Sequence, residues 1–280
     1  MFYKVLVFIL GESRFLRWKY YYRTGRRLNL RKPERFSEKL QWLKLNHRLP
    51  EMTQMADKIL AKQYVAERLG EAHVIKLLKI VESPQELQWD NMPAPPFVLK
   101  TNHDSGGVRV IRDKSDFNAR ELQQFYQRKM KSFYYGNLEW EYKNIQPAIF
   151  AEEHLQSDNK ANLLQDFKVH CFNGKPRFIQ TISDRESGAK ENWFDTKWNE
   201  LDIYYFSTTK AKVEQPATLS EMLVLSEKLA GAFPYMRIDW YNHRGRVYFG
   251  EFTFRPYGGF MNWNKDEVDF ELGHLIKLPS

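Results

Sequence analysis

The chain has little cysteine and no long apolar run. Cys171 is its only cysteine among 280 residues, so no disulfide can form within it, which fits a reducing compartment. The apolar run near the start, Val5 to Leu10, is far short of the roughly 20 residues of a spanning helix. Glu12 and Arg14 follow it with no small-residue cleavage site, so we expect no signal peptide. We therefore expect a cytoplasmic protein, with peripheral contact at the inner face of the membrane left open.

Several nucleotide- and nucleic-acid-binding motifs are also missing. The chain has no internal repeat, no low-complexity segment, no GxxxxGK[ST] loop and no recognisable nucleic-acid motif. Its net charge of +8 lies in residues 1–40, and the remaining 240 residues are neutral on balance. We therefore expect no nucleic-acid partner.

The first 40 residues carry eleven basic and three acidic side chains. Within them the stretch FLRWKYYYRTGRR alternates basic with aromatic residues. A helical surface of this kind can rest on anionic lipid headgroups or bind another polyanion. It can equally pack its aromatic residues inward and leave its arginines in water. We expect a short basic helical N-terminal segment, and contact of residues 1–32 with an anionic membrane remains one alternative.

The remaining pattern predicts a mixed α+β fold with antiparallel strand pairs. Ser37 and Ser115 are expected to cap helices at their N-termini, and Gly70 is expected to close one. Helices are expected over 33–45, 55–70, 115–136 and 219–233. Strands are expected over 73–81, 146–155 and on both sides of the loop after Lys100, with hairpins over 166–184 and 235–254.

The second hairpin carries paired carboxylates. Arg237 and Asp239 are two residues apart on the first strand, and Glu251 and Thr253 are two apart on the second. Each pair shares a face of its strand, and a short turn places the strands side by side. Asp239 and Glu251 are then expected to face one another. Either Arg237 or Mg²⁺ could compensate their charge, and an ordinary exposed ion pair is the alternative.

Lys100 ends an apolar run immediately before a glycine-bearing loop. The loop offers hydroxyl and backbone N–H donors at Ser105, Gly106 and Gly107, where the backbone can approach a phosphate closely. A strand and not a helix follows, which excludes a Rossmann fingerprint. A phosphate-binding loop and a plain hairpin both explain this stretch.

Taken in order, several stretches resemble the ATP-grasp superfamily, and more narrowly the TupA-like ATP-grasp proteins of surface polysaccharide and teichuronopeptide biosynthesis. They are KPERFSEKLQWLKL, ADKILAKQYVAERLG, FVLKTNHDSGG, IFAEEHL, DFKVHCFNGKPRFI, SDR, FPYMRIDWY and YFGEFTFRPYGG. The resemblance implies two α+β lobes with antiparallel sheets that grip a nucleotide between them. It implies a basic-aromatic N-terminal segment over 1–55, a lobe with the phosphate loop over 56–152 and a lobe with the metal-binding hairpin over 153–280.

The resemblance also implies site residues. Arg237 and Lys100 match the catalytic cations that stabilise the transferring phosphoryl group. Asp239, Glu251 and Thr253 match the Mg²⁺ ligands, although threonine stands where many relatives have asparagine. Arg185 and Arg255 are expected to contact the acidic substrate. The ATP-binding positions are Lys58, Lys100, Ser105, Gly106, Gly107, Glu152, Glu153, Leu155 and Lys168.

A function follows from the same resemblance. It implies an ATP- and Mg²⁺-dependent carboxylate–amine ligase that works through an acyl phosphate. The expected substrates are an amino acid or amine and an acidic sugar, a uronic acid, in surface or capsular polysaccharide. A sugar kinase would use the same ATP and metal residues, and a non-catalytic binding module in a glycan-assembly complex is a third alternative.

Overall fold

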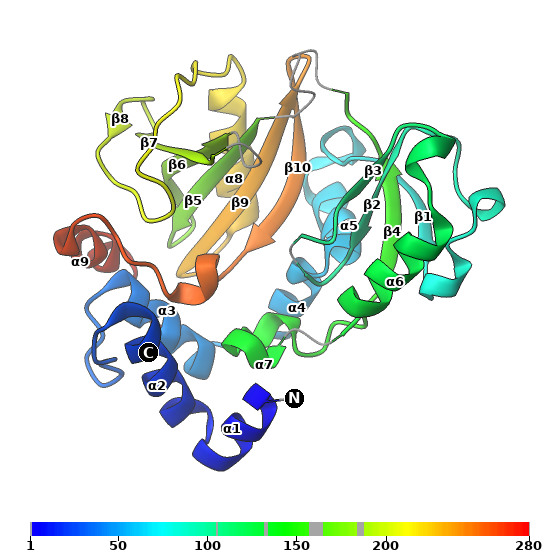
Figure 1. The fold of residues 1–280 in the computed structure, drawn as a ribbon. Coiled ribbons are helices and arrows are strands. Elements are labelled where there is room, and N and C mark those ends of the chain that lie inside the picture. The colour runs from blue at the N-terminus through cyan, green and yellow to red at the C-terminus, as the bar shows by residue number, and fades with distance from the viewer. Residues whose placement is uncertain (1, 105, 132–133, 157–164, 184–187, 280) are drawn as a thin grey trace. The chain divides into compact units, whose positions relative to one another are not determined.

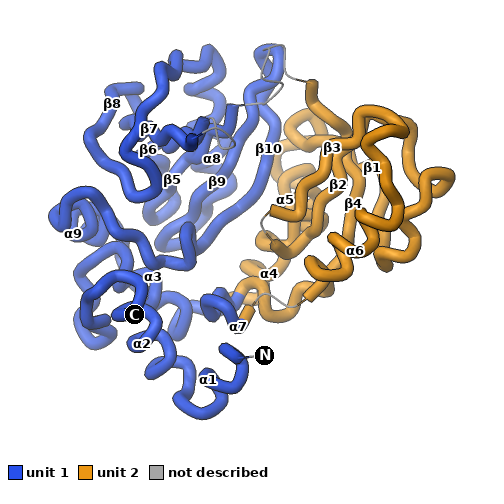
Figure 2. The backbone as a smooth tube through the Cα atoms, in the orientation of Figure 1, with its two compact units in different colours: residues 1–48, 135–140, 164–280 blue, residues 49–134, 141–163 orange. Residues whose placement is uncertain are grey.

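Two antiparallel sheets, each with its own helices, make up the computed structural model of the chain (Figure 1). The structure describes residues 2–104, 106–131, 134–156, 165–183 and 188–279. Its contacts divide the chain into two compact units (Figure 2). Unit 1 comprises residues 1–48, 135–140 and 164–280, and unit 2 comprises residues 49–134 and 141–163. The predicted α+β class with antiparallel strands is confirmed.

Unit 1 is built on a six-stranded sheet of order β10-β9-β5-β6-β7-β8. Helix α8 packs on one face of this sheet, where the Trp240 indole donates a hydrogen bond of 2.7 Å to the Ser226 hydroxyl. The strands are β5 (Asp166–Phe172), β6 (Lys175–Ser183), β7 (Lys190–Asp195), β8 (Glu200–Leu201), β9 (Tyr235–His243) and β10 (Arg246–Thr253). The helices are α1 (Phe2–Leu10), α2 (Glu12–Thr24), α3 (Phe36–Asn46), α8 (Leu219–Ala230) and α9 (Asp266–Leu275).

Tight turns fix the register of this sheet. The β5–β6 hairpin turns at Asn173 and Gly174, as the sequence predicts, and both have positive φ, 47° and 79°. Arg244 and Gly245 make the β9–β10 turn with φ of 50° and 74°. Positive φ at both central residues suits the twist of antiparallel strands, so each turn fixes which residues lie opposite one another.

Unit 2 is built on a four-stranded sheet of order β1-β4-β2-β3. One face of β2 packs Phe97 and Leu99 into a core with Leu122 and Tyr126. The opposite face of β2 carries Val98 and therefore also Lys100. The strands are β1 (Leu77–Val81), β2 (Phe97–Thr101), β3 (Arg109–Ile111) and β4 (Ile149–Glu153), and the helices are α4 (Pro50–Ala56), α5 (Lys58–Leu69) and α6 (Ala119–Lys129). Helix α7 (Tyr134–Asn137) lies where the chain passes from unit 2 to unit 1.

Two predicted helix caps are wrong. Arg35 is the N-cap of α3, and Ser37 lies inside the helix, where its hydroxyl donates to the Asp269 carboxylate at 2.6 Å. Asn118 caps α6, because Ser115 lies in a separate short turn and bonds to Asp113. The prediction that Gly70 closes α5 is confirmed.

The three domains expected from the sequence remain a prediction, because the two compact units are defined by contacts within the chain and not by the roles of their residues. In the contact-based division, residues 1–48 group with the C-terminal part of the chain. Over the described ranges, no helix combines the length and the apolar character needed to cross a membrane.

Candidate functional site

A cluster of charged side chains lies on the face of the unit 1 sheet opposite α8. Asp239 on β9 lies between Glu251 on β10 and Lys168 on β5 in the strand register. A β-bulge between Phe249 and Glu251 brings Glu251, not Gly250, opposite Asp239. The expected facing of Asp239 and Glu251 is therefore confirmed, and it depends on the bulge, since an unbroken register would turn Glu251 to the other face.

Arg237 joins the two carboxylates. Its Nε and Nη2 atoms donate to Asp239 at 2.6 and 2.8 Å, and Nη2 also lies 3.2 Å from Glu251 Oε1. The same nitrogen donates to Thr253 Oγ1 at 3.0 Å, and this hydroxyl lies 3.4 Å from Glu251 Oε1. A forked guanidinium suits such bidentate contact with a carboxylate. Arg237 and Asp239 are also buried, unlike an exposed ion pair on a sheet surface.

The charges of this cluster are largely removed from water. Burial alone would raise the pKa of Asp239, but Arg237 and Lys168 outweigh it and lower this pKa to about 2. Lys168 bonds to Asp239 and also to Asp166, the latter at 2.9 Å. Glu251 is the most open carboxylate of the group, with 36% of its side chain exposed. Asp239 is thus ionised and held by two cations at neutral pH, whereas Glu251 faces outward.

The donor set fits a magnesium ion bound together with phosphate. In the described part of the chain, no three His, Cys, Asp or Glu side chains form a group that could hold a metal ion. Magnesium usually takes one or two carboxylates and completes its octahedron with phosphate oxygens and water. Asp239 and Glu251 are such a pair, and the partly exposed Glu251 has room for an ion. Thr253 adds a hydroxyl oxygen beside them, at the position where an asparagine would offer an amide oxygen.

A buried histidine lies beside the cluster but does not titrate near neutral pH. His170 stands opposite Arg237 in the register, and its Nδ1 lies 2.7 Å from the Tyr235 hydroxyl. Burial, reinforced by Arg237, lowers the pKa of His170 to about 3. Its Nε2 lies 3.3 Å from Oε1, the side-chain amide oxygen of Gln180. These contacts give His170 a packing and hydrogen-bonding role.

Unit 2 contains a second charged group, formed by one carboxylate between two lysines. Glu152 on β4 forms an ion pair with Lys100 on β2, and its other oxygen lies 2.7 Å from Lys62 Nζ on α5. Lys100 is a diagonal cross-strand neighbour of Glu152, because Val98 stands opposite Glu152. Only 4% of the Glu152 side chain is exposed, against 8% for Lys62 and 19% for Lys100. We call Lys62, Lys100 and Glu152 the unit 2 triad.

Glu152 stays ionised because two lysines surround its carboxylate. Burial raises the pKa of Glu152, but Lys100 and then Lys62 outweigh burial, and the net pKa lies below its usual value. Burial lowers the pKa of Lys62, and the attraction to Glu152 opposes this. Lys62 also donates to the Ile75 carbonyl at 2.9 Å. Lys100, the most exposed member, is the one placed to reach a ligand.

The start of the loop after Lys100 is tightly bonded. The Lys58 ammonium donates to the Asp104 carbonyl at 2.7 Å, and the Asp57 carboxylate, which caps α5, accepts from the Asn102 amide at 2.9 Å. Asp104 also bonds to Thr101 and lies 3.0 Å from Lys129. This half of the loop is therefore held in place by α5 and α6.

Gly107 fits where no side chain could. A Cβ on it would overlap Thr101 Oγ1 and lie 2.8 Å from Asp104 Oδ1. Its carbonyl accepts from the buried Tyr126 hydroxyl at 3.0 Å. Gly106 is exposed and has a positive φ of 77°. Of the two glycines, Gly106 leaves its backbone open to a ligand.

The other predicted site residues have varied surroundings. Glu153 is exposed at the end of β4, and Leu155 is half-buried beyond it. Arg255 is buried, with its Nη1 donating to the Phe254 carbonyl at 3.0 Å. Ser105 and Arg185 lie outside the described residues. The roles predicted for all of these residues stay predictions.

Three charged residues of these groups were not expected from the sequence. Lys62 follows Lys58 by four residues, so the two share a helix face, and this spacing in ADKILAK was a signal that could have found it. Asp166 stands two residues before Lys168 on β5, which places both on the same strand face. Asp104 gave no comparable signal, because its partner Lys129 lies on α6.

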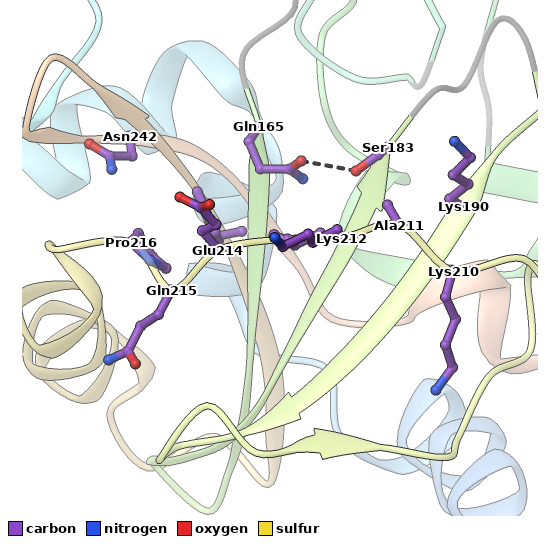
Figure 3. A pocket seen from close by; sticks show the side chains of 12 residues that line it. Gln165, Ser183, Lys190, Lys210, Ala211, Lys212, Glu214, Gln215, Pro216 and Asn242 are labelled. Carbon is purple, nitrogen blue, oxygen red and sulfur yellow. Dashed lines mark hydrogen bonds between the residues drawn. The ribbon is translucent and has the colours of Figure 1, made fainter.

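A cavity of about 690 Å³ lies on the α8 side of the unit 1 sheet (Figure 3). Phe167 and Asn242 line it, and both alternate with residues of the charged cluster along their strands. Gln165 and Ser183, also in its lining, share a hydrogen bond of 2.9 Å. The cavity therefore opens on the face opposite Asp239 and does not belong to the charged cluster.

The comparison with family models identifies the family of the chain. The model of the TupA-like ATP-grasp family matches residues 38–277, and the chain belongs to this family. The resemblance noted in the sequence is thereby confirmed, and with it the ATP-grasp fold. Among curated proteins, none matches the chain significantly.

Several solved ATP-grasp ligases are similar to the chain. The D-alanine–D-alanine ligase from Bacillus anthracis complexed with ATP is 19% identical, with a TM-score of 0.41, over 71% of this chain and 54% of that one. The ligase PsnB complexed with a phosphomimetic precursor variant, Mg and ADP is 14% identical, with a TM-score of 0.46, over 85% and 64%. The D-alanine–D-alanine ligase from Helicobacter pylori is 17% identical, with a TM-score of 0.46, over 86% and 69%. The chain thus spans between about half and just over two thirds of the length of these ligases.

Proposed function

We propose that the protein is an ATP-dependent carboxylate–amine ligase. It joins an amino acid or amine to an acidic sugar, a uronic acid, in the synthesis of a surface or capsular polysaccharide. The observation that carries the ATP-dependent part is the Arg237–Asp239–Glu251 cluster, in a chain that belongs to an ATP-grasp family. The sugar acceptor rests on the polysaccharide context of that family and on a pair of exposed aromatic rings.

The reaction needs positive charge at the transferring phosphoryl group. A substrate carboxylate oxygen attacks the γ-phosphorus of ATP, ADP leaves, and an acyl phosphate forms. The amine then attacks the acyl carbon, phosphate leaves, and the amine proton passes to solvent or phosphate. Arg237 stabilises the charge that develops on the phosphoryl oxygens, and Lys100 binds the nucleotide phosphates as a second cation. Magnesium held by Asp239 and Glu251 supplies further charge neutralisation when it is bound.

Arg237 is pre-positioned for this task. Asp239 fixes its Nε and Nη2 atoms from one side, and both side chains are buried. A cation that is already desolvated and oriented needs little reorganisation when negative charge develops beside it. Lys168 shares the Asp239 carboxylate and so keeps it ionised in this environment. We propose that Lys168 contacts the nucleotide when Asp239 is shared with the metal.

Two aromatic rings in unit 1 support a sugar acceptor. Phe206 and Tyr257 are 42% and 49% exposed, and their ring centroids lie 6.1 Å apart. Tyr257 has a positive φ of 55°, an unfavourable conformation for a large side chain. Buried Glu191 holds the other ring in place by accepting the backbone amide of Phe206 at 2.8 Å. The C–H face of a sugar ring packs well on such exposed aromatic faces.

The test is a coupled assay of ADP release with a uronic acid and a panel of amines. A ligase releases ADP only when acid and amine are both present, and its product contains an amide. Hydroxylamine in place of the amine should trap the acyl phosphate as a hydroxamate. ADP release with the sugar alone, giving a stable phosphoester, would instead identify a kinase. Absence of ADP release with every pair, despite nucleotide binding, would favour a binding module.

The acceptor surface can be tested separately. Phe206→Ser should raise the KM for the sugar about tenfold or more while the KM for ATP stays unchanged, since in this proposal the ring binds the acceptor and not the nucleotide. Val224→Ser, an exposed apolar residue on α8, is the matched control. Equal KM values for the sugar in wild type and Phe206→Ser would contradict the proposed acceptor surface.

A further inference from the structure

The first helix of the chain places its apolar side chains in water. None of the nine residues of α1 is buried, although most are apolar. Phe2, Val5, Phe8 and Ile9 follow helical spacing along one side, and Phe8 is 88% exposed. A helix that leaves so much apolar surface exposed to water indicates an interaction site for a partner that covers it.

The second helix combines an inner apolar face with an outer face of a different kind. Phe15, Leu16 and Tyr20 of α2 are buried. On its outer face the exposed aromatic residues alternate with arginines, and the Trp18 and Tyr22 rings are stacked with centroids 6.0 Å apart. The exposed residues of this face are Arg14, Arg17, Trp18, Tyr21 and Tyr22. Tryptophan and tyrosine favour the region of lipid headgroups, where one end of the ring is apolar and the other wet.

The same segment is strongly basic. Residues 1–32 contain nine lysines and arginines and a single acid, Glu12, whose carboxylate forms an ion pair with Arg48. Arg14, Arg27 and Arg31 are exposed, and in the described parts of the chain none of them forms an ion pair. Arg26 and Lys32 are paired with Asp266 and Glu34, so the positive charge left over lies mainly on the exposed arginines.

We propose that α1 and α2 form a docking surface for a membrane rich in anionic lipid. Helix α1, too short to span a bilayer, lies in the plane of the interface with Phe2, Val5, Phe8 and Ile9 among the acyl chains. The arginines of α2 and of the following segment contact lipid phosphates. A nucleic acid or a soluble polyanion would bind the arginines but leave the apolar side of α1 in water, so the membrane is the partner that accounts for both features.

The experiment is co-sedimentation of the full chain with vesicles, once of neutral phosphatidylcholine and once with a third of phosphatidylglycerol. The wild type should bind the anionic vesicles at low salt and release at high salt, because screening shortens the reach of surface charges. It should bind neutral vesicles much more weakly. No sedimentation with anionic vesicles at low salt would overturn the proposal.

Two groups of substitutions separate charge from apolar contact. Changing Arg14, Arg27 and Arg31 to Gln should weaken binding on the order of a hundredfold, from roughly fivefold per cation near such a surface. Changing Phe2, Phe8 and Ile9 to Ser should weaken it by about tenfold or more through lost apolar burial. All six side chains are exposed, so thermal unfolding should stay unchanged in both variants.

Matched controls decide between the membrane and a general polyanion site. The double variant Arg120→Gln, Lys228→Gln removes two exposed cations outside α1 and α2, and Val224→Ser removes an exposed apolar side chain of α8. Neither control should alter vesicle binding. Equal losses in the controls would overturn the proposal. So would a serine variant of α1 that binds vesicles like the wild type, because charge alone would then suffice, as for heparin or RNA.

Discussion

Removing the Glu152 carboxylate should strongly destabilise the protein. In Glu152→Gln the side chain keeps its size, but Lys62 and Lys100 lose the charge that compensates them. Only 8% of the Lys62 side chain is exposed, so water cannot replace the lost partner. Breaking a buried ion pair by removing one partner costs about 3–5 kcal/mol. With roughly 2–4 °C per kcal/mol for a chain near this size, we expect Tm to fall by about 6–20 °C.

The stability lost in Glu152→Gln should depend on pH. Burial already lowers the pKa of Lys62, and without Glu152 it should fall further. A lysine whose folded pKa lies below its unfolded value costs stability at low pH, and that cost disappears as pH rises toward the unfolded value near 10.4. The gap in unfolding free energy between wild type and Glu152→Gln should therefore narrow between neutral pH and pH 10. Adding Lys62→Met to the variant should restore part of the lost stability at pH 7.

The assay is urea and thermal unfolding at several pH values. Glu153→Gln is the matched control, because this neighbouring side chain is exposed and its loss should change stability by no more than about 0.5 kcal/mol. If Glu152→Gln costs no more than Glu153→Gln, the unit 2 triad does not exist as described and the reasoning is refuted.

Three further predictions concern single residues. The pKa of Asp239 is lowered to about 2. Its contribution of about 2 kcal/mol to the free energy of unfolding should therefore be fully present above pH 4–5 and lost as pH falls through about 2. In urea unfolding, Asp239→Asn should flatten this pH dependence. His170, with a pKa lowered to about 3, should show no ring titration by NMR between pH 5 and 8, and a midpoint near 6.5 would contradict its buried environment. Gly107→Ala should cost about 1–3 kcal/mol through overlap with Thr101, whereas Gly136→Ala, with open space around it, should cost far less.

Local sequence patterns predicted the parts of the fold that depend on neighbours along the chain. Asn173 and Gly174 identify their hairpin because a two-residue turn with positive φ needs such residues. Alternation along β9 places Arg237 and Asp239 on one face, and alternation along β10 places Glu251 and Thr253 on one face, but it is the bulge that turns the second pair to the same side as the first. Gly70 closes α5 for a similarly local reason.

Contacts between distant segments explain what the sequence did not reveal. Ser37 looked like a helix cap, but Asp269, 232 residues later, binds its hydroxyl within the helix. The spacing of Lys58 and Lys62 shows that they share a helix face, but it does not identify Glu152, on a strand 90 residues away, as the partner of Lys62. The β-bulge before Glu251 has no distinct signal either, beyond the presence of Gly250. These features depend on tertiary packing, which no short window of sequence contains.

The central claim, that Asp239 and Glu251 bind Mg²⁺ together with a nucleotide, is tested most directly by thermal unfolding with Mg²⁺ and ADP. At a hundred times its Kd, a ligand stabilises the folded state by about 2.7 kcal/mol, which is a rise in Tm of roughly 5–11 °C. The account predicts this rise for the wild type and for Glu221→Gln, an exposed acid on α8, and a much smaller one for Glu251→Gln. A Tm that does not respond to Mg²⁺ and millimolar ADP, or an equal response in Glu251→Gln, would contradict it.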